Sequence, residues 1–387
     1  MLEAPWHYLQ ISDALDREFV SALAKLVPVI GWQPVMRPLG FIQNGAGSES
    51  ELTHEDPPLR IRKFPMQKGY ARPPFSSLAR IGTQVTRRLT RQSAQPEMTP
   101  LICSTPYYAP VAERWRGPVI YYLTDLMAAY GGADEKLVQS LDRRICSAAT
   151  LVCPNSNRLA NYLMSKAECP AHKIKIIPNA TRQSNILPSP LIAPSELPDD
   201  ASDLPRPVAG VIGNMAGNLN WALLKQMVEG TPEYSWLFVG PTNMALDNQG
   251  ESAARQAVLQ MGGRVRFVGR KPYGALVHYA RGIDVAMLPY FRREPTFSGS
   301  STRFYEHLAA CWPMIATRGF EELLHKEPLL KLIDSPGEGI QALRELLSRN
   351  FDDGQISNRW LASQQGTWEV RAATMMAALL EQKKAAA

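Results

Sequence analysis

Short apolar segments alternate with longer amphipathic segments through the first half of the chain. The apolar segments predict strands at residues 6–12, 32–36, 59–65, 100–104, 118–124, 150–153 and 174–177. The amphipathic segments predict helices at residues 15–26, 76–92, 106–115, 134–148 and 156–166, the last capped by Asn155 or Ser156, and residues 44–58 read as a loop. Strands that alternate with helices and have apolar cores are typical of a parallel α/β sheet.

The same alternation restarts at residue 208. Strands are predicted at 208–212, 235–239, 265–268, 284–288, 313–316 and 330–333, and helices at 219–228, 273–281, 337–348 and 368–382. Between the halves, residues 183–207 are rich in proline and acidic side chains, which predicts a linker. We therefore expect an α/β protein with domains at 1–182 and 208–365, joined by the 183–207 linker and followed by a terminal helix at 366–387. The default ligand site of such a chain is a cleft at the carboxyl ends of the parallel strands.

Composition narrows the class of protein. The chain has 387 residues, 45% hydrophobic and 20% charged, which suits a soluble globular protein of two domains. A net charge of +6 indicates a basic face, and we expect no nucleic-acid partner. The five cysteines form no C-x-x-C pair, which argues against a disulfide framework or a zinc site. Charged residues near the N-terminus and the lack of a long apolar run predict a cytoplasmic location, with peripheral membrane association still open.

The predicted helix at 76–92 has a distinctive face. Arg80, Arg87, Arg88 and Arg91 lie at helical spacing beside the apolar Leu78, Ile81, Val85 and Leu89. The simple interpretation is an ordinary amphipathic surface helix. The alternative is that Ser76 to Gln92 meets an anionic membrane surface on the inner face of the bilayer.

Several well-known motifs are missing from the sequence. There is no G-x-G-x-x-G dinucleotide fingerprint after the first strand, no P-loop and no G-x-S-x-G elbow, which disfavours dehydrogenases, P-loop NTPases and α/β hydrolases. There is also no D-x-D pair to hold a divalent cation on a diphosphate. We expect neither a metal nor another cofactor, so a diphosphate would need arginine, lysine and helix dipoles. The basic residues near predicted loops of the second half are Lys225, Arg270, Lys271 and Arg303.

The stretch 288–317 has the most specific local pattern. It reads as a strand end, a Gly/Ser/Thr loop that includes Ser300, Ser301 and Thr302, a helix and a further apolar strand. A loop that opens a helix offers free backbone N–H groups to phosphate. Arg303 lies in the opening turn and Glu306 follows one turn later. A cation for phosphate and a carboxylate for hydroxyl groups suit a nucleotide-sugar site.

Longer motifs carry a family resemblance. The segments VRFVGRKPYGALVHYARGIDVAMLPY and STRFYEHLAACWPMIAT resemble the second half of a family-4-like glycosyltransferase of the GT-B fold, in its bacterial exopolysaccharide branch. YYLTDLMAAYGG, RRICSAATLVCPNSNRLANYL and IKIIPNAT resemble the first half of that branch. The resemblance implies two Rossmann-like, doubly wound parallel-sheet domains that face a cleft. It implies that the first domain (1–182) binds the acceptor and that the second (208–365) binds most of the nucleotide-sugar donor. It also implies that the terminal helix packs back on the first domain.

The resemblance assigns the donor site. Glu306 matches the second glutamate of the family's E-x7-E motif, which holds the donor ribose, whereas Ser298 stands where the first glutamate would be. Arg303 replaces a lysine of this branch, and its planar fork suits phosphate. Cys311 and Trp312 replace the usual Gly-Lys pair. The remaining predicted donor-site residues are Gly213, Asn214, Gly269, Arg270, Ser300, Ser301 and Thr302.

Two carboxylates are candidates for catalysis. Asp125 ends a strong first-half strand, where it could act as general base on an acceptor hydroxyl, with inversion at the sugar. Asp13, at the end of the first strand, is the second candidate. Each could instead be structural, Asp125 as a cap or hydrogen-bond partner and Asp13 as a helix N-cap.

The predicted function is therefore metal-independent transfer of a sugar from a nucleoside-diphosphate sugar, expected to carry uridine, to a glycan or lipid-linked acceptor. The alternative is a catalytically inactive nucleotide-sugar-binding or scaffold protein of the same fold. Ser298, Cys311 and Trp312 keep that alternative open. A phosphorylase of this fold would need a cofactor lysine and a longer chain.

Overall fold

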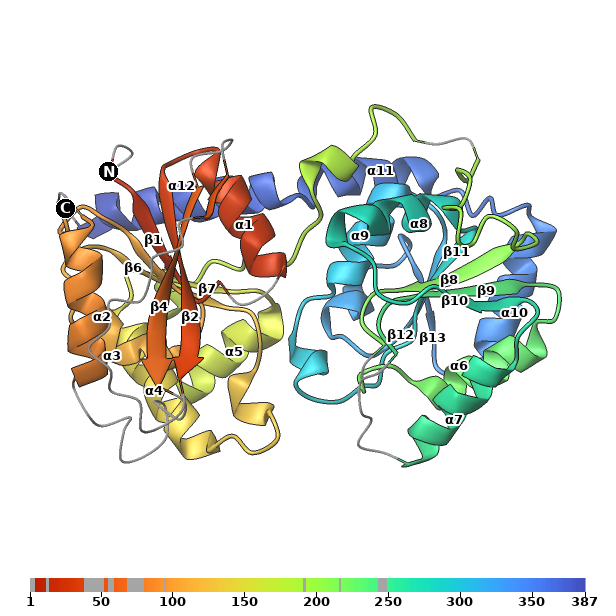
Figure 1. Ribbon diagram of the computed structural model, residues 1–387, viewed down its shortest axis with the longest axis horizontal. Helices are drawn as coiled ribbons and strands as arrows, with labels where there is room; N and C mark the ends of the chain where they lie inside the picture. Colours follow the sequence, from red (N-terminus) through yellow and green to blue (C-terminus); the bar gives the residue numbers. More distant parts are fainter. Residues whose placement is uncertain are drawn as a thin grey trace. The chain divides into compact units, whose positions relative to one another are not determined.

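The computed structural model describes residues 4–11, 14–37, 52–54, 59–67, 80–93, 95–190, 193–215, 217–242 and 249–386. They divide into two compact units, Met1–Pro178 with Trp368–Ala387, and Asn179–Thr367. The segment 183–207 therefore lies inside the second unit. The terminal helix, blue in Figure 1, belongs to the first unit among red, orange and yellow elements.

The first unit is built on a seven-stranded sheet of order β3-β4-β2-β1-β5-β6-β7. All pairs are parallel except β3–β4, which is antiparallel. The chain starts at β1, builds outward through β2 to β4 and returns to the other side of β1 with β5, so the sheet is doubly wound. Its elements are β1 Trp6–Leu9, α1 Ala14–Ala24, β2 Val29–Arg37, β3 Leu52–His54, β4 Leu59–Gln67, α2 Arg80–Arg91, β5 Leu101–Cys103, η2 Pro106–Tyr108, α3 Ala109–Ala112, β6 Val119–Leu123, η3 Met127–Ala129, α4 Glu135–Ala148, β7 Leu151–Pro154, α5 Asn157–Lys166, η4 Ala171–Lys173 and α12 Trp368–Ala386.

The second unit has a six-stranded parallel sheet of order β10-β9-β8-β11-β12-β13. This is the Rossmann order 3-2-1-4-5-6, with the reversal between β8 and β11. Its elements are η5 Gln183–Asn185, β8 Val208–Ile212, α6 Trp221–Gly230, β9 Ser235–Val239, α7 Gln249–Gln260, β10 Val265–Phe267, η6 Tyr273–Ala275, α8 Leu276–Gly282, β11 Val285–Leu288, η7 Thr296–Ser298, α9 Thr302–Ala310, β12 Met314–Thr317, η8 Glu322–His325, β13 Lys331–Ile333, α10 Pro336–Ser348 and α11 Ile356–Gln365.

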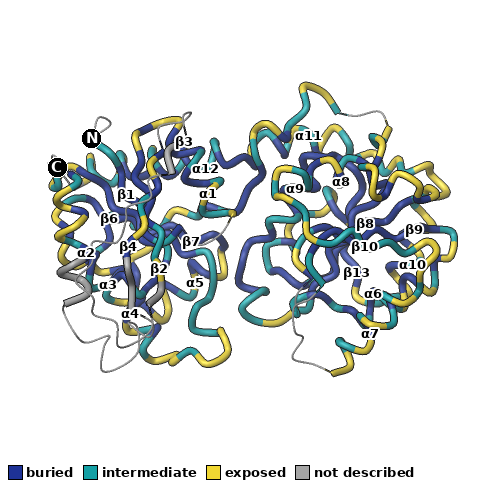
Figure 2. The backbone as a smooth tube through the Cα atoms, in the orientation of Figure 1, coloured by how far each residue is buried: buried dark blue, intermediate teal, exposed yellow. Residues whose placement is uncertain are grey.

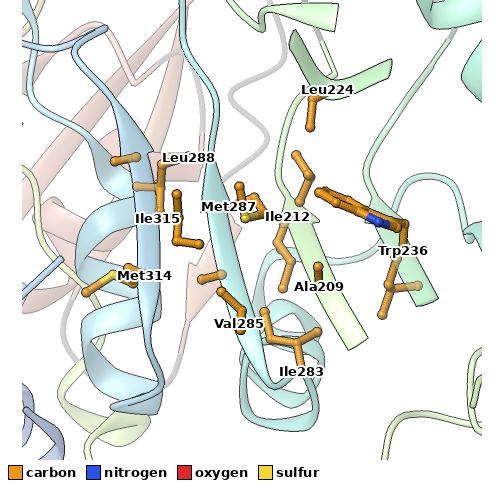
Figure 3. Close-up of a cluster of buried hydrophobic side chains, with 14 of the residues drawn as sticks. Ala209, Ile212, Leu224, Trp236, Ile283, Val285, Met287, Leu288, Met314 and Ile315 are labelled. Carbon is orange, nitrogen blue, oxygen red and sulfur yellow. The ribbon is translucent and has the colours of Figure 1, made fainter. Parts of the chain in front are cut away.

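Buried strands form the core of each unit, and they are dark blue in Figure 2. In the second unit, side chains from β8, β9, β11 and β12 pack together beside Leu224 and Ile283 (Figure 3). Ile283 lies over Gly210 of β8, where an added Cβ would come within 2.7 Å of Ile283 Cδ1. Burying each such aliphatic side chain contributes roughly 1.5–3 kcal/mol. The near-continuous apolar runs of these strands in the sequence reflect burial on both faces of the sheet.

The terminal helix α12 is held to the first unit by both apolar and charged contacts. Trp368, buried at the start of α12, meets Phe19 of α1 edge-on with ring centroids 6.3 Å apart. Beside it, Lys25 Nζ lies 2.7 Å from a Glu369 carboxylate oxygen. The ion pair is partly exposed and adds little, so the buried aromatic contact provides most of the stabilisation.

The sequence missed some elements. Residues 174–177 form no strand, because only the single bridge Val152↔Ile174 continues the sheet there. Strand β3 lies within the predicted 44–58 loop, and α7 and α11 were not predicted. Ser156, one of two predicted caps, accepts from Leu159 N at 3.0 Å and caps the start of α5.

None of the helices in the described ranges has both the length and the apolar content to cross a membrane.

Candidate functional site

The strand order of the second unit reverses between β8 and β11. In doubly wound sheets, ligands bind at the carboxyl ends of the strands beside such a reversal. Gly213 follows β8 with φ +118°, a conformation that L side chains rarely adopt. An added Cβ at Gly213 would lie 2.5 Å from Arg303 Nε, so only glycine lets this guanidinium lie against the backbone. The structure thus brings together Gly213 and Arg303, which are both predicted donor-site residues.

Arg303 is fixed at these strand ends from two sides. Its Nη2 donates to the Asn214 carbonyl, and its guanidinium carbon lies 5.3 Å from the centroid of the Tyr290 ring. Its Nη1 is buried and makes no hydrogen bond to any residue that the structure describes. A buried donor without a partner costs roughly 1–3 kcal/mol, and an anionic oxygen would satisfy it. The geometry at Arg303 therefore suits one oxygen of a phosphate.

Loops from neighbouring strands enclose Arg303. Asn220 N donates to Pro289 O at 2.8 Å and Phe291 N to Asn218 O at 2.9 Å, which joins the loops after β8 and β11. Thr317 Oγ1, at the end of β12, donates to Tyr290 O at 2.6 Å. These bonds hold the Tyr290 ring under the guanidinium, so the cation is positioned before any ligand binds.

Glu306, one turn after Arg303 on α9, is braced by three side chains. Tyr273 Oη donates to Oε1 at 2.5 Å, and Thr181 Oγ1 and Asn185 Nδ2 donate to Oε2 at 3.1 and 3.2 Å. Arg182 in turn lies over the Tyr273 ring, 5.1 Å from its centroid. The carboxylate is half-buried and held in one orientation. Its ribose-binding role remains a prediction, with its orientation now explained by these partners.

The start of α9 is organised differently from the sequence expectation. The carboxylate of Glu322 accepts from Ser300 Oγ at 2.8 Å and from Ser301 N at 3.0 Å. Ser301 Oγ caps Phe304 N, and Thr302 Oγ1 accepts from Asn179 Nδ2 at 2.9 Å. An internal carboxylate thus lies where a phosphate was expected. A phosphate role for these three residues would need Glu322 to move away, because two anions repel each other.

The other predicted cations, Arg270, Lys271 and Lys225, differ in whether they are free to bind a ligand, and Gly269 directly precedes the first of them. Gly269 follows β10 with φ +69°, and an added Cβ would meet nothing within 4 Å. The adjoining Arg270 is exposed and makes no ion pair with a described residue. In contrast, Lys271 pairs with Asp200, and Lys225 pairs with Glu229 at 2.7 Å. Gly269 and Arg270 therefore stay candidates for the nucleotide, whereas the two lysines are used structurally.

Sequence reasoning overlooked a carboxylate beside Ser298. Ser298 is buried at the end of η7, and its backbone N donates to Glu294 at 3.1 Å. The loop has Ser298 where the family has its first glutamate, but it carries another glutamate, Glu294, four residues earlier in the sequence. Farther along α9, Cys311 adopts φ +70° at the helix C-cap, a left-handed position that favours glycine. Cys311 stands where the family has glycine, and its backbone keeps the left-handed conformation that glycine would favour.

His307 is a second residue whose setting the sequence did not predict. It lies on α9, 2% exposed, and neither ring nitrogen makes a hydrogen bond with a described residue. Burial, together with the charge of Arg303, lowers the pKa of His307 to about 3. The imidazole is therefore neutral at physiological pH.

The predicted catalytic carboxylates belong to the first unit. Asp125 follows β6 and is half-buried; its carbonyl accepts from Met127 N at 2.9 Å. Asn155, after β7, donates from Nδ2 to the Thr124 carbonyl at 2.6 Å and so fixes the residue before Asp125. Asp13 lies outside the described residues. Within the described ranges, no group of three or more His, Cys, Asp or Glu side chains is arranged to hold a metal ion.

Comparisons with known proteins concern the fold and the class of protein. No protein-family model matches the sequence. TuaH of Bacillus subtilis (strain 168), a glycosyltransferase assigned to teichuronic acid biosynthesis, is 23% identical over 249 residues, which cover 61% of this chain and 60% of TuaH. The match thus spans about three fifths of that relative's length.

Solved structures match over nearly the whole chain. Sucrose-phosphate synthase from Thermosynechococcus elongatus has a TM-score of 0.71 at 15% identity, covering 99% of this chain and 100% of that one. Anabaena HepE in complex with UDP and glucose has a TM-score of 0.63 at 16% identity, covering 98% and 100%. The predicted GT-B fold is confirmed, and so is the resemblance to glycosyltransferases of this fold.

Proposed function

We propose that this protein is a glycosyltransferase that moves a sugar from a UDP-sugar to an acceptor hydroxyl without a metal ion. The observation that carries the proposal is the buried Nη1 of Arg303, which lacks a described partner beside Gly213 at the switch point of the second unit. Support also comes from HepE, solved with UDP and glucose, and from TuaH, a glycosyltransferase assigned to teichuronic acid biosynthesis.

The proposed chemistry is a direct displacement. The acceptor hydroxyl gives its proton to the Asp125 carboxylate as its oxygen bonds to the anomeric carbon. The bond between that carbon and the diphosphate oxygen breaks, and its electron pair leaves with UDP. Arg303 meets the charge that develops on the leaving diphosphate, and Glu306 accepts hydrogen bonds from the ribose. The acceptor is proposed to be a glycan or a lipid-linked sugar.

Binding of UDP to variants of Arg303 tests the donor site. Titration calorimetry with UDP should show Arg303→Met about 10- to 100-fold weaker than wild type, the loss of a charge-assisted hydrogen bond. Arg349→Met, at an exposed arginine of the same unit, serves as the matched control and should bind as wild type. Equal affinity of both variants would remove Arg303 from the donor site.

A second candidate is a protein that binds nucleotide-sugar without turnover. The observation that favours it is Glu322, which lies at the start of α9 where a phosphate was expected. Release of UDP from UDP-glucose, in water alone or with an acceptor, separates the two. An enzyme releases UDP slowly without acceptor, whereas a scaffold binds and releases UDP-glucose intact.

We further propose that α2 meets an anionic membrane surface. Arg87, Arg88 and Arg91 are exposed on this helix, while Val85 and Leu89 are buried in the first unit. These two apolar side chains are therefore not available to insert into lipid, and contact would be electrostatic, about 1 kcal/mol for each arginine. Replacing the three arginines by glutamine should abolish sedimentation with phosphatidylglycerol vesicles. Neutral phosphatidylcholine vesicles are the control, and unchanged sedimentation of the variant would refute the contact.

A further inference from the structure

Two cysteines meet just beneath the surface of the first unit. Cys146 lies in the last turn of α4, and Cys169 follows the end of α5, 23 residues later in the sequence. The two thiols form a side-chain hydrogen bond with each other. Both side chains are buried, 1% and 4% exposed, and both are free thiols. This pair has no part in the donor site or in the proposed transfer chemistry.

The end of α4 is tied to the segment after α5 on both sides of the thiols. On one side, Arg143 Nε lies 3.1 Å from a carboxylate oxygen of Glu168. On the other, Lys173 Nζ donates to the Cys146 and Ser147 carbonyls at 3.3 and 3.2 Å. Glu168 and Lys173 flank the second cysteine in the sequence. The contact between the thiols is therefore held in place by the packing of α4 against this segment.

The surroundings favour the thiolate of Cys169 over that of Cys146. The hydrogen bond from Cys146 lowers the pKa of Cys169, and the Lys173 ammonium acts in the same direction, against the effect of burial. The same hydrogen bond, together with burial, raises the pKa of Cys146. The thiolate is the reactive form of cysteine, and a second thiol beside it can close a disulfide. The geometry thus makes Cys169 the attacking sulfur and Cys146 the resolving one.

The remaining cysteines have a different setting. Burial raises the pKa of each of these thiols, which are Cys103, Cys153 and Cys311. A buried thiol with a raised pKa is inert at neutral pH. Reaction of the folded protein with an oxidant should therefore begin at Cys169.

The thiol pair lies far from the predicted reacting residue. Thr150, which follows α4, donates from its backbone N to Val119 O at the start of β6, whereas Asp125 follows the other end of that strand. The segment that carries the second cysteine instead contacts α12, because Gln382 Nε2 donates to the His172 carbonyl. A bond between the thiols would therefore join α4 to the segment that α12 contacts, and the inference does not depend on the proposed function.

We propose that Cys146 and Cys169 are a modification site at which a peroxide produces an intramolecular disulfide. The Cys169 thiolate attacks one oxygen of hydrogen peroxide and becomes a sulfenic acid. The other oxygen leaves as hydroxide and takes up the proton that Cys169 released. The Cys146 sulfur then attacks the sulfenic sulfur, and the S–S bond forms as the sulfenic oxygen leaves with the Cys146 proton as water. Two thiols lose two electrons, and one peroxide becomes two waters.

The structure also limits the oxidant and allows the bond to close. At 4% exposure, Cys169 is reached by a small peroxide more readily than by a bulky disulfide. Formation of the S–S bond requires the sulfurs to approach each other. Cys169 lies between α5 and η4, outside any helix or strand, so its backbone can adjust without breaking a helix.

Peptide mapping of the full chain tests the proposal. The folded protein is treated with a few equivalents of hydrogen peroxide at neutral pH, its free thiols are blocked with iodoacetamide, and it is digested with trypsin without reduction. Peptides 145–158 and 167–173 should be recovered as a linked pair that dithiothreitol separates. Cys146→Ser and Cys169→Ser should each abolish the link. Cys153→Ser is the matched control, since Cys153 lies in the same peptide as Cys146, and it should form the link as wild type does.

Thermal unfolding of the wild type gives a measurement that does not depend on any variant. The disulfide closes a loop of 23 residues, so the oxidised protein should unfold at a temperature about 5–10 °C higher than the reduced protein. Dithiothreitol should reverse the shift. The proposal would be overturned if the folded wild type forms no link, if the link needs urea, or if it runs through Cys153. Conversion of Cys169 to a sulfinic acid without a link would equally remove Cys146 as its partner.

Discussion

A glycine with positive φ, Gly213, lies against a guanidinium at the switch point of the second unit. A glutamine with positive φ, Gln10, follows β1 at the switch point of the first unit, where the strand order reverses between β1 and β5, and it accepts a hydrogen bond from Tyr108. Apart from the antiparallel edge strand β3, both sheets follow the same doubly wound order, so the two positions are equivalent in topology. Gly213 adopts its conformation at little cost, because it has no Cβ. Gln10 adopts its conformation at about 1–2 kcal/mol, which a glycine there would save.

The difference indicates what each side chain is kept for. At the second switch point, the lack of a side chain makes room for Arg303, and the site is positively charged. At the first, the Gln10 side chain is retained and its Oε1 accepts a hydrogen bond from Tyr108. One strand order thus has different residues at the equivalent strand end of each unit, and fold alone does not decide what binds there.

Neutralising the predicted general base, Asp125, should have the largest effect on activity. Asp125→Asn should lower the rate of sugar transfer about 100- to 10,000-fold, because the acceptor proton loses its base. UDP affinity, which we propose depends on the second unit, should stay at the wild-type value. The measurement is UDP release with an acceptor present, and Asp134→Asn, which keeps a good helix cap on α4, is the control. Transfer at the wild-type rate would return Asp125 to a structural role.

Removing the charge of Glu306 should have the next largest effect. Glu306→Gln should weaken UDP binding by about 1.5–3 kcal/mol, the worth of a charged hydrogen bond. Tyr273→Phe removes only one brace of that carboxylate, and we expect a loss of about 1 kcal/mol or less. Calorimetry with UDP measures both. Unchanged affinity in Glu306→Gln would place the ribose elsewhere.

Much of the second switch point could be predicted from sequence because its signals are local. The apolar strands, the turn at Gly213 and the helix that carries Arg303 and Glu306 each lie within a short segment, and the structure places them as elements of that order. The braces of Glu306 could not be predicted, because Thr181 and Asn185 lie 125 and 121 residues away. Glu322 is similarly invisible from sequence, since nothing local to it indicates that it caps α9.

The first switch point was largely missed for the same physical reason. The conformation of Gln10 depends on Ile11 packing against Gly31 and on a bond from Tyr108, 98 residues away. The propensity of Gln10 itself would predict an ordinary extended or helical residue. Likewise, strand 174–177 was predicted from its apolar pattern, but these residues find only a single bridge at the edge of the sheet. Local pattern predicts elements well, whereas special conformations come from contacts between distant segments.

The two units also differ in how they hold a buried histidine. His7 of β1 accepts from Trp32 Nε1 at 3.1 Å and lies 2.7 Å from Ser93 Oγ, while His307 has no described hydrogen-bond partner. Burial, aided by the charge of Arg62, lowers the pKa of His7 to about 4, and that of His307 is about 3. Unfolded histidine has a pKa near 6.5, so the unfolded chain takes up more protons as the pH falls below that value.

Acid should therefore destabilise both units. Each histidine should reduce the free energy of unfolding by about 2 kcal/mol between pH 7 and pH 5, because both stay neutral in the folded state over that window. Urea unfolding at the two pH values measures the loss. His307→Leu should remove the part of this loss of unfolding free energy that comes from His307, and it breaks no described hydrogen bond. Arg349→Met should lose as much free energy on acidification as wild type. If the variant and the wild type lose the same free energy on acidification, His307 is not buried as a neutral ring.

Removing divalent metal ions by chelation should change the activity least of all the changes considered. If the Arg303 guanidinium meets the charge of the leaving diphosphate, a divalent cation is not required there, and the sequence has no D-x-D pair to hold one. Excess EDTA should then change the rate of UDP release from UDP-glucose by less than about twofold, since no charge stabilisation is lost. Arg303→Met assayed with and without Mg²⁺ completes the test. Loss of wild-type activity on chelation, or rescue of Arg303→Met by Mg²⁺ to the wild-type rate, would mean that a metal ion and not the arginine balances the diphosphate.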